Sequence, residues 1–125
     1  MPKRVLLGVE DEEHYPFSDA VEANGFVFLA GVVGSRPDAD LAVPGGTEAE
    51  TRRALELVAE RLRAVGLTPM DVVQVTVHLV DLDGFEAMNR AYRELFPAQQ
   101  PARTTVWVSR LASNYRVELT VVAAR

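Results

Sequence analysis

The sequence contains no cysteine among its 125 residues and only two histidines, His14 and His78. The absence of cysteine excludes disulfide bonds, thiolate catalysis and zinc sites that use cysteine ligands. Two imidazoles are too few for a typical protein-held transition metal, so we expect no metal site. Every apolar run is far shorter than the roughly 20 residues that a membrane-spanning helix needs. We therefore expect no membrane partner.

Basic residues are outnumbered, with 13 lysines and arginines against 18 acidic residues and a formal net charge of −5. Nucleic acids and anionic membranes attract basic surfaces, so this balance argues against both as partners. The apolar share of 48% is close to the globular average, which excludes disorder as the main state. The length predicts a single domain over residues 1–125. The N-terminal segment lacks an evident cleavage site, so we expect a cytoplasmic protein.

Two segments have the apolar spacing of amphipathic helices, with steps of three and four residues. The first is predicted to begin at a capping box, in which Thr47 caps the helix and Glu50 reaches back. It is predicted to end at Gly66, because glycine is favoured just after a helix. The second is predicted to begin at Asp83 and to end before Pro97.

The remaining segments alternate between apolar and polar residues, which is typical of β-strands. The N-terminal segment starting at Met1 predicts a first strand, and Asn24-Gly25 predicts a turn before the second. Further strands are predicted over residues 26–33, 72–80, 103–109 and 115–123. The resulting order is strand, strand, helix, strand, helix, strand, strand. It predicts an α+β fold in which two helices pack on one face of a sheet.

Two helices cover only one side of a sheet, so the distribution of side chains on the other side matters. One apolar face is predicted for Val73, Val75, Val77 and Leu79. Trp107 and Val122 are predicted to lie on the uncovered side, where an apolar face exposed to water would favour association. We therefore expect a homo-oligomer with a group of polar residues near the subunit boundary. This group is Arg103, Thr105, His78 and Glu118.

A series of short motifs runs along nearly the whole chain. They are Pro16-Phe17-Ser18-Asp19-Ala20, Phe28-Leu29-Ala30-Gly31, Thr51-Arg52-Arg53-Ala54-Leu55, Met88-Asn89-Arg90-Ala91-Tyr92, Pro101-Ala102-Arg103-Thr104-Thr105-Val106 and Val117-Glu118-Leu119. In this order and spacing they resemble the motifs of the Rid proteins, the reactive intermediate deaminases also called the YjgF family.

The resemblance implies a chorismate-mutase-like mixed sheet and a homotrimer whose sheets enclose a central barrel, with sites in the clefts between chains. It also implies cofactor-free hydrolysis of small enamino and imino acids, such as 2-aminoacrylate and 2-iminobutanoate, to 2-keto acids and ammonia. By position, Arg103 would bind the substrate carboxylate and Glu118 would hold and activate the attacking water. The residues implied to line the pocket are Phe17, Ser18, Gly31, Asn89 and Thr105.

The chemistry of these residue types is compatible with that activity. A guanidinium group binds a planar carboxylate through two parallel hydrogen bonds, and a carboxylate can accept a proton from water and return it later. Several positions depart from the family pattern: Phe17 replaces Tyr, Ala30 replaces Ser, Val32 replaces Gln or His, Thr105 replaces the Cys of some members, and the Gln of the helix start is Ala49 or Glu50. The pocket near Phe17 is thus more apolar than usual, which indicates a bulkier or different ligand.

Other interpretations remain open at this point. The same fold could use Arg103 to bind a carboxylate without turnover, which the changes at Phe17 and Val32 favour. Endoribonuclease activity, ascribed to some relatives, is the weakest alternative because the chain is acidic and has no basic stripe. Arg103 could instead pair with an acidic neighbour, and Glu118 could be the ion-pair partner of Arg103 or of Arg116.

Overall fold

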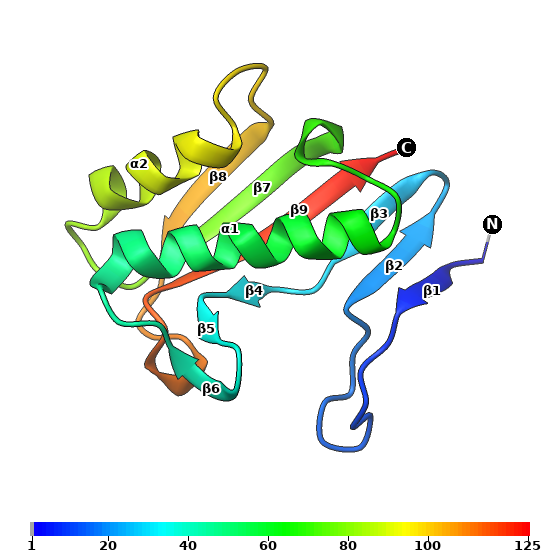
Figure 1. Cartoon of the computed structure of the whole chain (residues 1–125), viewed down its shortest axis with the longest axis horizontal. Helices are drawn as coiled ribbons and strands as arrows, with labels where there is room; N and C mark the ends of the chain where they lie inside the picture. Colours follow the sequence, from blue (N-terminus) through cyan, green and yellow to red (C-terminus); the bar gives the residue numbers. More distant parts are fainter. Residues whose placement is uncertain (1) are drawn as a thin grey trace.

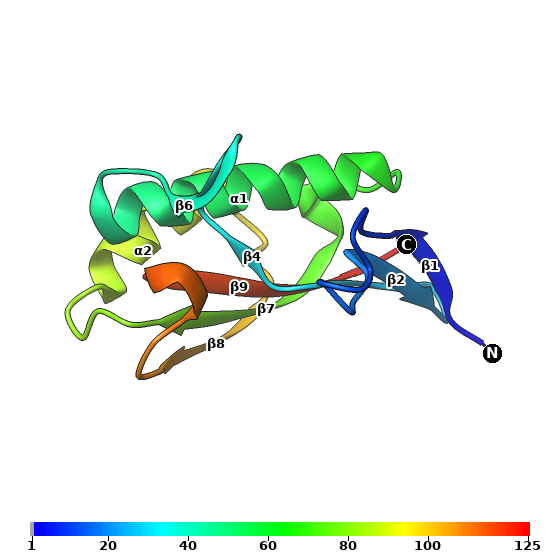
Figure 2. The ribbon, with the colours of Figure 1, turned by 90° about the horizontal axis from the view of Figure 1, so that it is seen from below.

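The computed structural model describes residues 2–125, so Met1 of the predicted first strand lies outside the described residues. Six strands lie side by side in the order β1 (Arg4–Leu7), β2 (Ala20–Ala23), β3 (Phe26–Leu29), β9 (Val117–Ala124), β7 (Val72–Leu79) and β8 (Ala102–Trp107) (Figure 1). The short strand β4 (Val32–Val33) also pairs with β9. Only β7 and β8 run parallel. Both helices lie on one face of this mixed sheet, which confirms the predicted α+β class (Figure 2).

Helix α1 (Gly46–Ala64) begins one residue earlier than predicted, and the predicted capping box is wrong. Gly45 and Gly46 adopt positive φ angles of 118° and 82°, which carry the chain into the helix without a side-chain cap. The hydroxyl of Thr47 instead donates a hydrogen bond to Asp81 Oδ2 at 2.5 Å. Gly66 follows the helix with a φ of 81°, as predicted, and its N–H donates to the Arg63 carbonyl.

Helix α2 (Phe85–Leu95) begins two residues after the predicted start at Asp83. The Gly84 N–H donates to the Asp81 carbonyl at 3.1 Å, so a tight turn leads into the helix and no side chain caps it. The helix ends before Pro97, as predicted. Its position over β7 and β8 places it above the edge of the sheet.

The hydrophobic core fills the space between the helices and the sheet. It includes Val75, Val77 and Leu79 of β7, Val117, Leu119 and Val121 of β9, and Leu55, Val58, Leu62 and Met88 of the helices. The prediction that Val73 shares this face is wrong, because this side chain is 44% exposed. The pairing of β7 with β9 shifts between Val72 and Gln74, so that Val72 takes the buried place.

The strand predicted over residues 26–33 is two strands, because the chain breaks the ladder at Ala30 and Gly31. Asn24 and Gly25 both have positive φ angles and form the predicted turn between β2 and β3. Strand β2 was not predicted. Neither was the small separate hairpin of β5 (Ser35–Arg36) and β6 (Ala39–Ala42). Two single turns of 3-10 helix, η1 (Pro69–Asp71) and η2 (Ala112–Asn114), complete the elements.

Trp107 lies on the helix-covered side of the sheet, so the prediction that it lies on the uncovered side is wrong. The parallel register pairs Arg103 with Val75, Thr105 with Val77 and Trp107 with Leu79, whose side chains all face the core. Arg103, Thr105 and Trp107 therefore share that side. The uncovered face carries Val122, as predicted, together with Phe26 and Phe28, each of which is 45% exposed.

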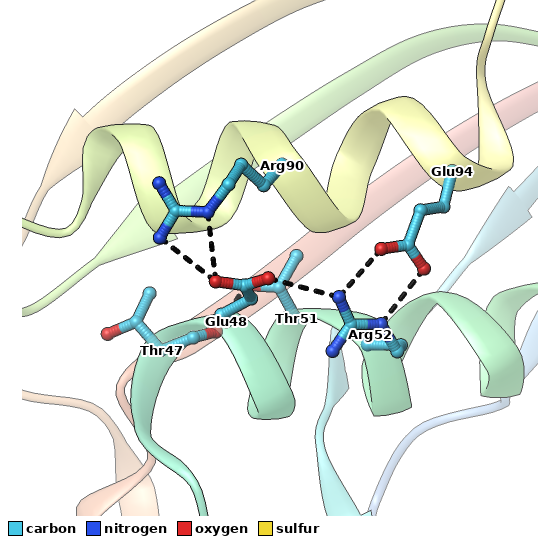
Figure 3. Close-up of polar contacts among 6 residues, drawn as sticks. All are labelled: Thr47, Glu48, Thr51, Arg52, Arg90 and Glu94. Carbon is cyan, nitrogen blue, oxygen red and sulfur yellow. Dashed lines mark hydrogen bonds and ion pairs between the residues drawn. The ribbon is translucent and has the colours of Figure 1, made fainter.

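Four charged side chains join α1 to α2 on the outside of the molecule (Figure 3). Arg52 binds Glu48 at 3.1 Å on its own helix and Glu94 at 2.6 Å on α2. Glu48 also binds Arg90 of α2 at 2.9 Å. The charges alternate across both helices, so this network links α2 to α1 through three ion pairs.

Candidate functional site

Arg103 lies in β8 beneath α2, and its guanidinium contacts the rings of two aromatic residues. Its Cζ atom is 4.8 Å from the centroid of the Tyr92 ring and 5.6 Å from that of Phe85. Such contacts between a cation and the face of a ring orient the guanidinium without occupying its N–H donors. The rings therefore hold Arg103 in place and leave it free to bind an anion.

The Arg103 side chain has no acidic partner among residues 2–125. Its hydrogen bond there runs from Nη1 to the sulfur of Met88 at 3.7 Å, and a thioether is a weak acceptor. Six other arginines form ion pairs in this part of the chain, and none of these ion pairs includes Arg103. The interpretation that Arg103 pairs with an acidic neighbour is therefore wrong.

A cavity of about 200 Å³ opens beside the guanidinium. Asn89 of α2 lines it and is 8% exposed, so its amide lies within reach of a ligand held by Arg103. The remaining lining residues are Tyr92, Arg93, Gln100 and Pro101. The Tyr92 hydroxyl is buried without a hydrogen-bond partner in the described structure, and burial raises the pKa of Tyr92 to about 12. This hydroxyl therefore stays protonated at neutral pH.

Glu118 lies on the opposite face of the sheet from Arg103. Its neighbours in β9, Val117 and Leu119, are fully buried in the core, so the alternation of the strand directs Glu118 away from the helices. It is paired across the ladders with His78 and Val33. A Cβ added at Gly31 would overlap the Glu118 carboxylate. A larger residue at this position would therefore displace the Glu118 carboxylate from its place beside Gly31.

The Glu118 carboxylate accepts no hydrogen bond and forms no ion pair within residues 2–125. Arg116, the alternative partner, binds the buried Glu50 instead, with Nη1 at 2.9 Å from Oε2. The backbone N–H of Arg116 also donates to Glu50 at 2.8 Å. The interpretation of Glu118 as the ion-pair partner of Arg103 or Arg116 is therefore wrong.

Phe17 and Ser18 lie in the loop between β1 and β2. The Ala30 N–H donates to the Asp19 carbonyl at 3.0 Å, which ties the end of this loop to the segment before Gly31. The Phe17 ring is 51% exposed and lies 6.1 Å from the ring of Tyr15. The loop thus presents an aromatic ring to the solvent.

The predicted site residues therefore form two groups. Arg103, Asn89 and Thr105 lie on the helix-covered side, with Thr105 half-buried between Arg103 and Trp107 along β8. Gly31 and Glu118 lie on the uncovered side, and the loop of Phe17 and Ser18 is attached beside Gly31. Within one chain the sheet separates the two groups, so no single chain brings Arg103 and Glu118 to one small substrate.

A profile of the protein family described as endoribonuclease L-PSP matches residues 10–125 of this chain. The chain belongs to the Rid/YjgF family. It is 38% identical to reactive intermediate deaminase A, chloroplastic, of Arabidopsis thaliana, over 86% of this chain and 58% of that protein. It is 34% identical to the 2-iminobutanoate/2-iminopropanoate deaminase of Mus musculus, over 88% and 82% of the two chains.

A solved structure agrees with this assignment. E. coli TdcF with bound serine is 28% identical and superimposes with a TM-score of 0.82, covering 95% of this chain and 92% of TdcF. The family resemblance predicted from the motifs is thus confirmed. One relative of this Rid protein is named chloroplastic and another, from Schizosaccharomyces pombe, mitochondrial, so the cytoplasmic location stays a prediction.

Sequence reasoning missed the surroundings of Arg103 in this Rid protein. The residues of α2 that contact Arg103 are Phe85, Met88 and Tyr92. Their spacing is that of any helix face that packs on a core, so it does not indicate that an arginine, and not a leucine or valine, lies against them. Only the parallel register of β7 and β8, which places Arg103 under α2, reveals the contact.

Two further observations bear on the chemistry of the site. Among residues 2–125, no three His, Cys, Asp or Glu side chains gather in a way that could hold a metal ion. Over the same residues, neither helix has the length and apolar character needed to cross a membrane.

Proposed function

We propose that this Rid protein hydrolyses 2-imino acids, and the enamines that tautomerise to them, to 2-keto acids and ammonia. The observation that carries the proposal is the free, oriented guanidinium of Arg103 beside the cavity that Asn89 lines. A guanidinium without a partner, held half-buried by two rings, is suited to bind a planar carboxylate through two hydrogen bonds. The names of the Arabidopsis and mouse relatives support this reaction class, and the serine bound to TdcF is itself a carboxylate.

In the proposed reaction a water molecule attacks C2 of the protonated imine while one proton of the water passes to the Glu118 carboxylate. The tetrahedral intermediate carries a hydroxyl and an amino group on C2. Glu118 then returns the proton to the amino nitrogen, and the C–N bond breaks so that ammonia leaves. The hydroxyl gives its proton to the Glu118 carboxylate as it becomes the carbonyl of the keto acid. One carboxylate serves as base and then as acid, as general acid–base catalysis requires. Arg103 holds the carboxylate, and so C2, in a fixed plane during both steps.

We propose further that the active form is a homotrimer in which each site takes Arg103 and Asn89 from one chain and Glu118 and Gly31 from a neighbour. The separation of these residues by the sheet supports a shared site. The exposed apolar side chains of the uncovered face, among them Val5, Phe26 and Phe28, support burial of that face against other copies. A trimer whose three sheets enclose a central barrel, as the family resemblance implies, would cover this face.

The experiment that tests the proposed function generates 2-imino acids in situ from amino acids with an amino-acid oxidase. Release of the keto acid is then followed with and without the protein. Acceleration that is lost in Arg103→Lys is the expected result. Saturable binding of carboxylates with no acceleration for any imino acid would instead identify a carboxylate-binding module without turnover.

A further inference from the structure

Two partly exposed aromatic rings lie next to Arg103 on the helix-covered side of the sheet, that of Phe85 from α2 and that of Trp107 from β8. Phe85, 37% exposed, has its ring centroid 5.6 Å from the Arg103 Cζ atom. Trp107, 43% exposed, has its ring 6.1 Å beyond Phe85 at an interplanar angle of 31°. Because β8 is the last strand of the sheet, no further strand of the same chain continues beyond this row of Arg103, Phe85 and Trp107.

The indole ring of Trp107 is fixed although it is exposed. Its Nε1–H donates to the Asp81 carbonyl at 2.9 Å, and the same carbonyl accepts the Gly84 N–H in the turn before α2. The Asp81 side chain accepts the hydrogen bond from Thr47. A ring held in this way loses little conformational freedom when a ligand packs on it, so binding on it is favoured.

The other side of Arg103 is different in character. There Tyr92 is buried and packs on Phe96 with ring centroids 4.8 Å apart, and the adjoining cavity is lined by polar groups of Asn89 and Gln100. These polar groups suit a carboxylate and an imine, whereas an apolar substituent gains most from the open rings. The polar end of a substrate is thus suited to the Asn89 and Gln100 side of Arg103, and its apolar substituent is suited to the Phe85 and Trp107 side.

We infer that Phe85 and Trp107 form the binding surface for the substrate's side chain, so that this protein prefers 2-imino acids with a large apolar or aromatic substituent. The inference rests on the proposed function, because it takes Arg103 as the carboxylate-binding group. A methyl substituent stops short of the indole. A benzyl or isobutyl group extends from C2 across Phe85 towards Trp107 and removes both ring faces from water.

The first test compares kcat/KM for the imines formed from alanine, leucine and phenylalanine. The leucine and phenylalanine imines are expected to react with kcat/KM about 10-fold or more above the alanine imine, since one methylene group in an apolar pocket discriminates by about 10-fold or more. Trp107→Ala is expected to lower this ratio by about 10-fold, whereas Trp107→Phe retains most of it. Met70→Ala, which removes another exposed apolar side chain outside the cavity lining, is the matched control and leaves the ratio unchanged.

The second test needs no turnover, because Trp107 is the only tryptophan of the chain and its fluorescence reports on the proposed surface. Titration with 4-methyl-2-oxopentanoate is expected to change the emission saturably and at lower concentration than titration with pyruvate. Arg103→Lys is expected to weaken both titrations. Turnover with equal preference for small and large imines, and no change of emission, would overturn the inference alone. Preferential binding of the larger keto acid without turnover of any imine would overturn the proposed function and leave the binding surface standing.

Discussion

Arg103 and Glu118 point to opposite sides of one sheet, although the proposed reaction needs both at the same substrate. The register of β8 on β7 places Arg103 beside the buried Val75, and the alternation of β9 places Glu118 between the buried Val117 and Leu119. Neither the Arg103 nor the Glu118 side chain can reach through the sheet to its other face. In the proposed reaction the site is completed only when the uncovered face of one chain meets the β8 edge of another, so we expect activity to require oligomerisation.

Mixing two inactive variants tests this shared site. Arg103→Ala and Glu118→Gln are each expected to lose activity as pure trimers. When equal amounts are unfolded together and refolded, about a quarter of the sites receive both native residues from two different chains. Recovery of about a quarter of the wild-type rate is the expected result. A mixture as inactive as its components would show that both residues act from the same chain.

The uncovered face gives a second prediction. Phe28→Asp places a charge among the exposed apolar side chains of this face and is expected to yield a folded monomer without deaminase activity, because burying an unpaired charge in the interface is costly. Light scattering reports the mass and circular dichroism the fold. Leu82→Asp, at a position 86% exposed outside the sheet, is the control and remains a trimer. A trimer in Phe28→Asp would place the interface elsewhere.

Most of the fold could be predicted from the sequence because the spacing of apolar residues and the glycines and prolines that end an element are local properties. The spacing of Leu55, Val58 and Leu62 defines α1, and Gly66 defines its end, whatever the rest of the chain does. The predicted start of α1 is wrong because Thr47 and Glu50 have the spacing of a capping box but do not form one. Thr47 binds Asp81 and Glu50 binds Arg116, and both partners are far away in the sequence.

The site was less predictable because strand register is not a local property. In β8 both faces are mixed, so alternation alone could not decide whether Arg103 and Trp107 face the helices. The parallel pairing with β7 decides it, and it reverses the side assigned to Trp107. The family motifs identified Arg103, Asn89, Gly31 and Glu118 as a set, but not their separation by the sheet.

Arg103→Lys tests the role of the guanidinium. Lysine keeps the charge but offers no planar pair of donors, so one charge-assisted hydrogen bond to the substrate carboxylate is lost. Such a bond contributes about 1.5–3 kcal/mol, which corresponds to a loss of about 10- to 100-fold in rate. The thermal midpoint should change little, since Arg103 has no ion pair to lose within residues 2–125. A normal rate with a lowered midpoint would mean that Arg103 is structural.

The buried carboxylate of Glu50 gives a prediction about stability. Its side chain is inaccessible to solvent and is bound by Arg116, which is 48% exposed. Arg116→Met leaves this carboxylate buried without its cation, and we expect a loss of about 3 kcal/mol, at the lower end for buried pairs because Arg116 is half in water. Urea unfolding measures this loss. Adding Glu50→Gln to Arg116→Met should recover part of it, whereas a further loss would mean that Glu50 does not depend on Arg116.

The ion pairs between α1 and α2 predict how stability depends on pH. Hydrogen bonds from Arg90 and Arg52 hold the pKa of Glu48 below its ordinary value of 4.5, and the bond from Arg52 does the same for Glu94. A carboxylate whose pKa is lowered by folding stabilises the folded state above its unfolded pKa, and this contribution is lost as the pH falls through the folded pKa. Glu94→Gln is therefore expected to destabilise the protein at pH 7, with the difference from wild type disappearing as the pH falls well below 4.5. Urea unfolding across this range measures both proteins. Glu60→Gln, on the same side of the molecule but outside these ion pairs, is the control and should follow the wild-type curve. A stability difference for Glu94→Gln that persisted at the lowest pH would show that the helices are held together by packing and not by this network.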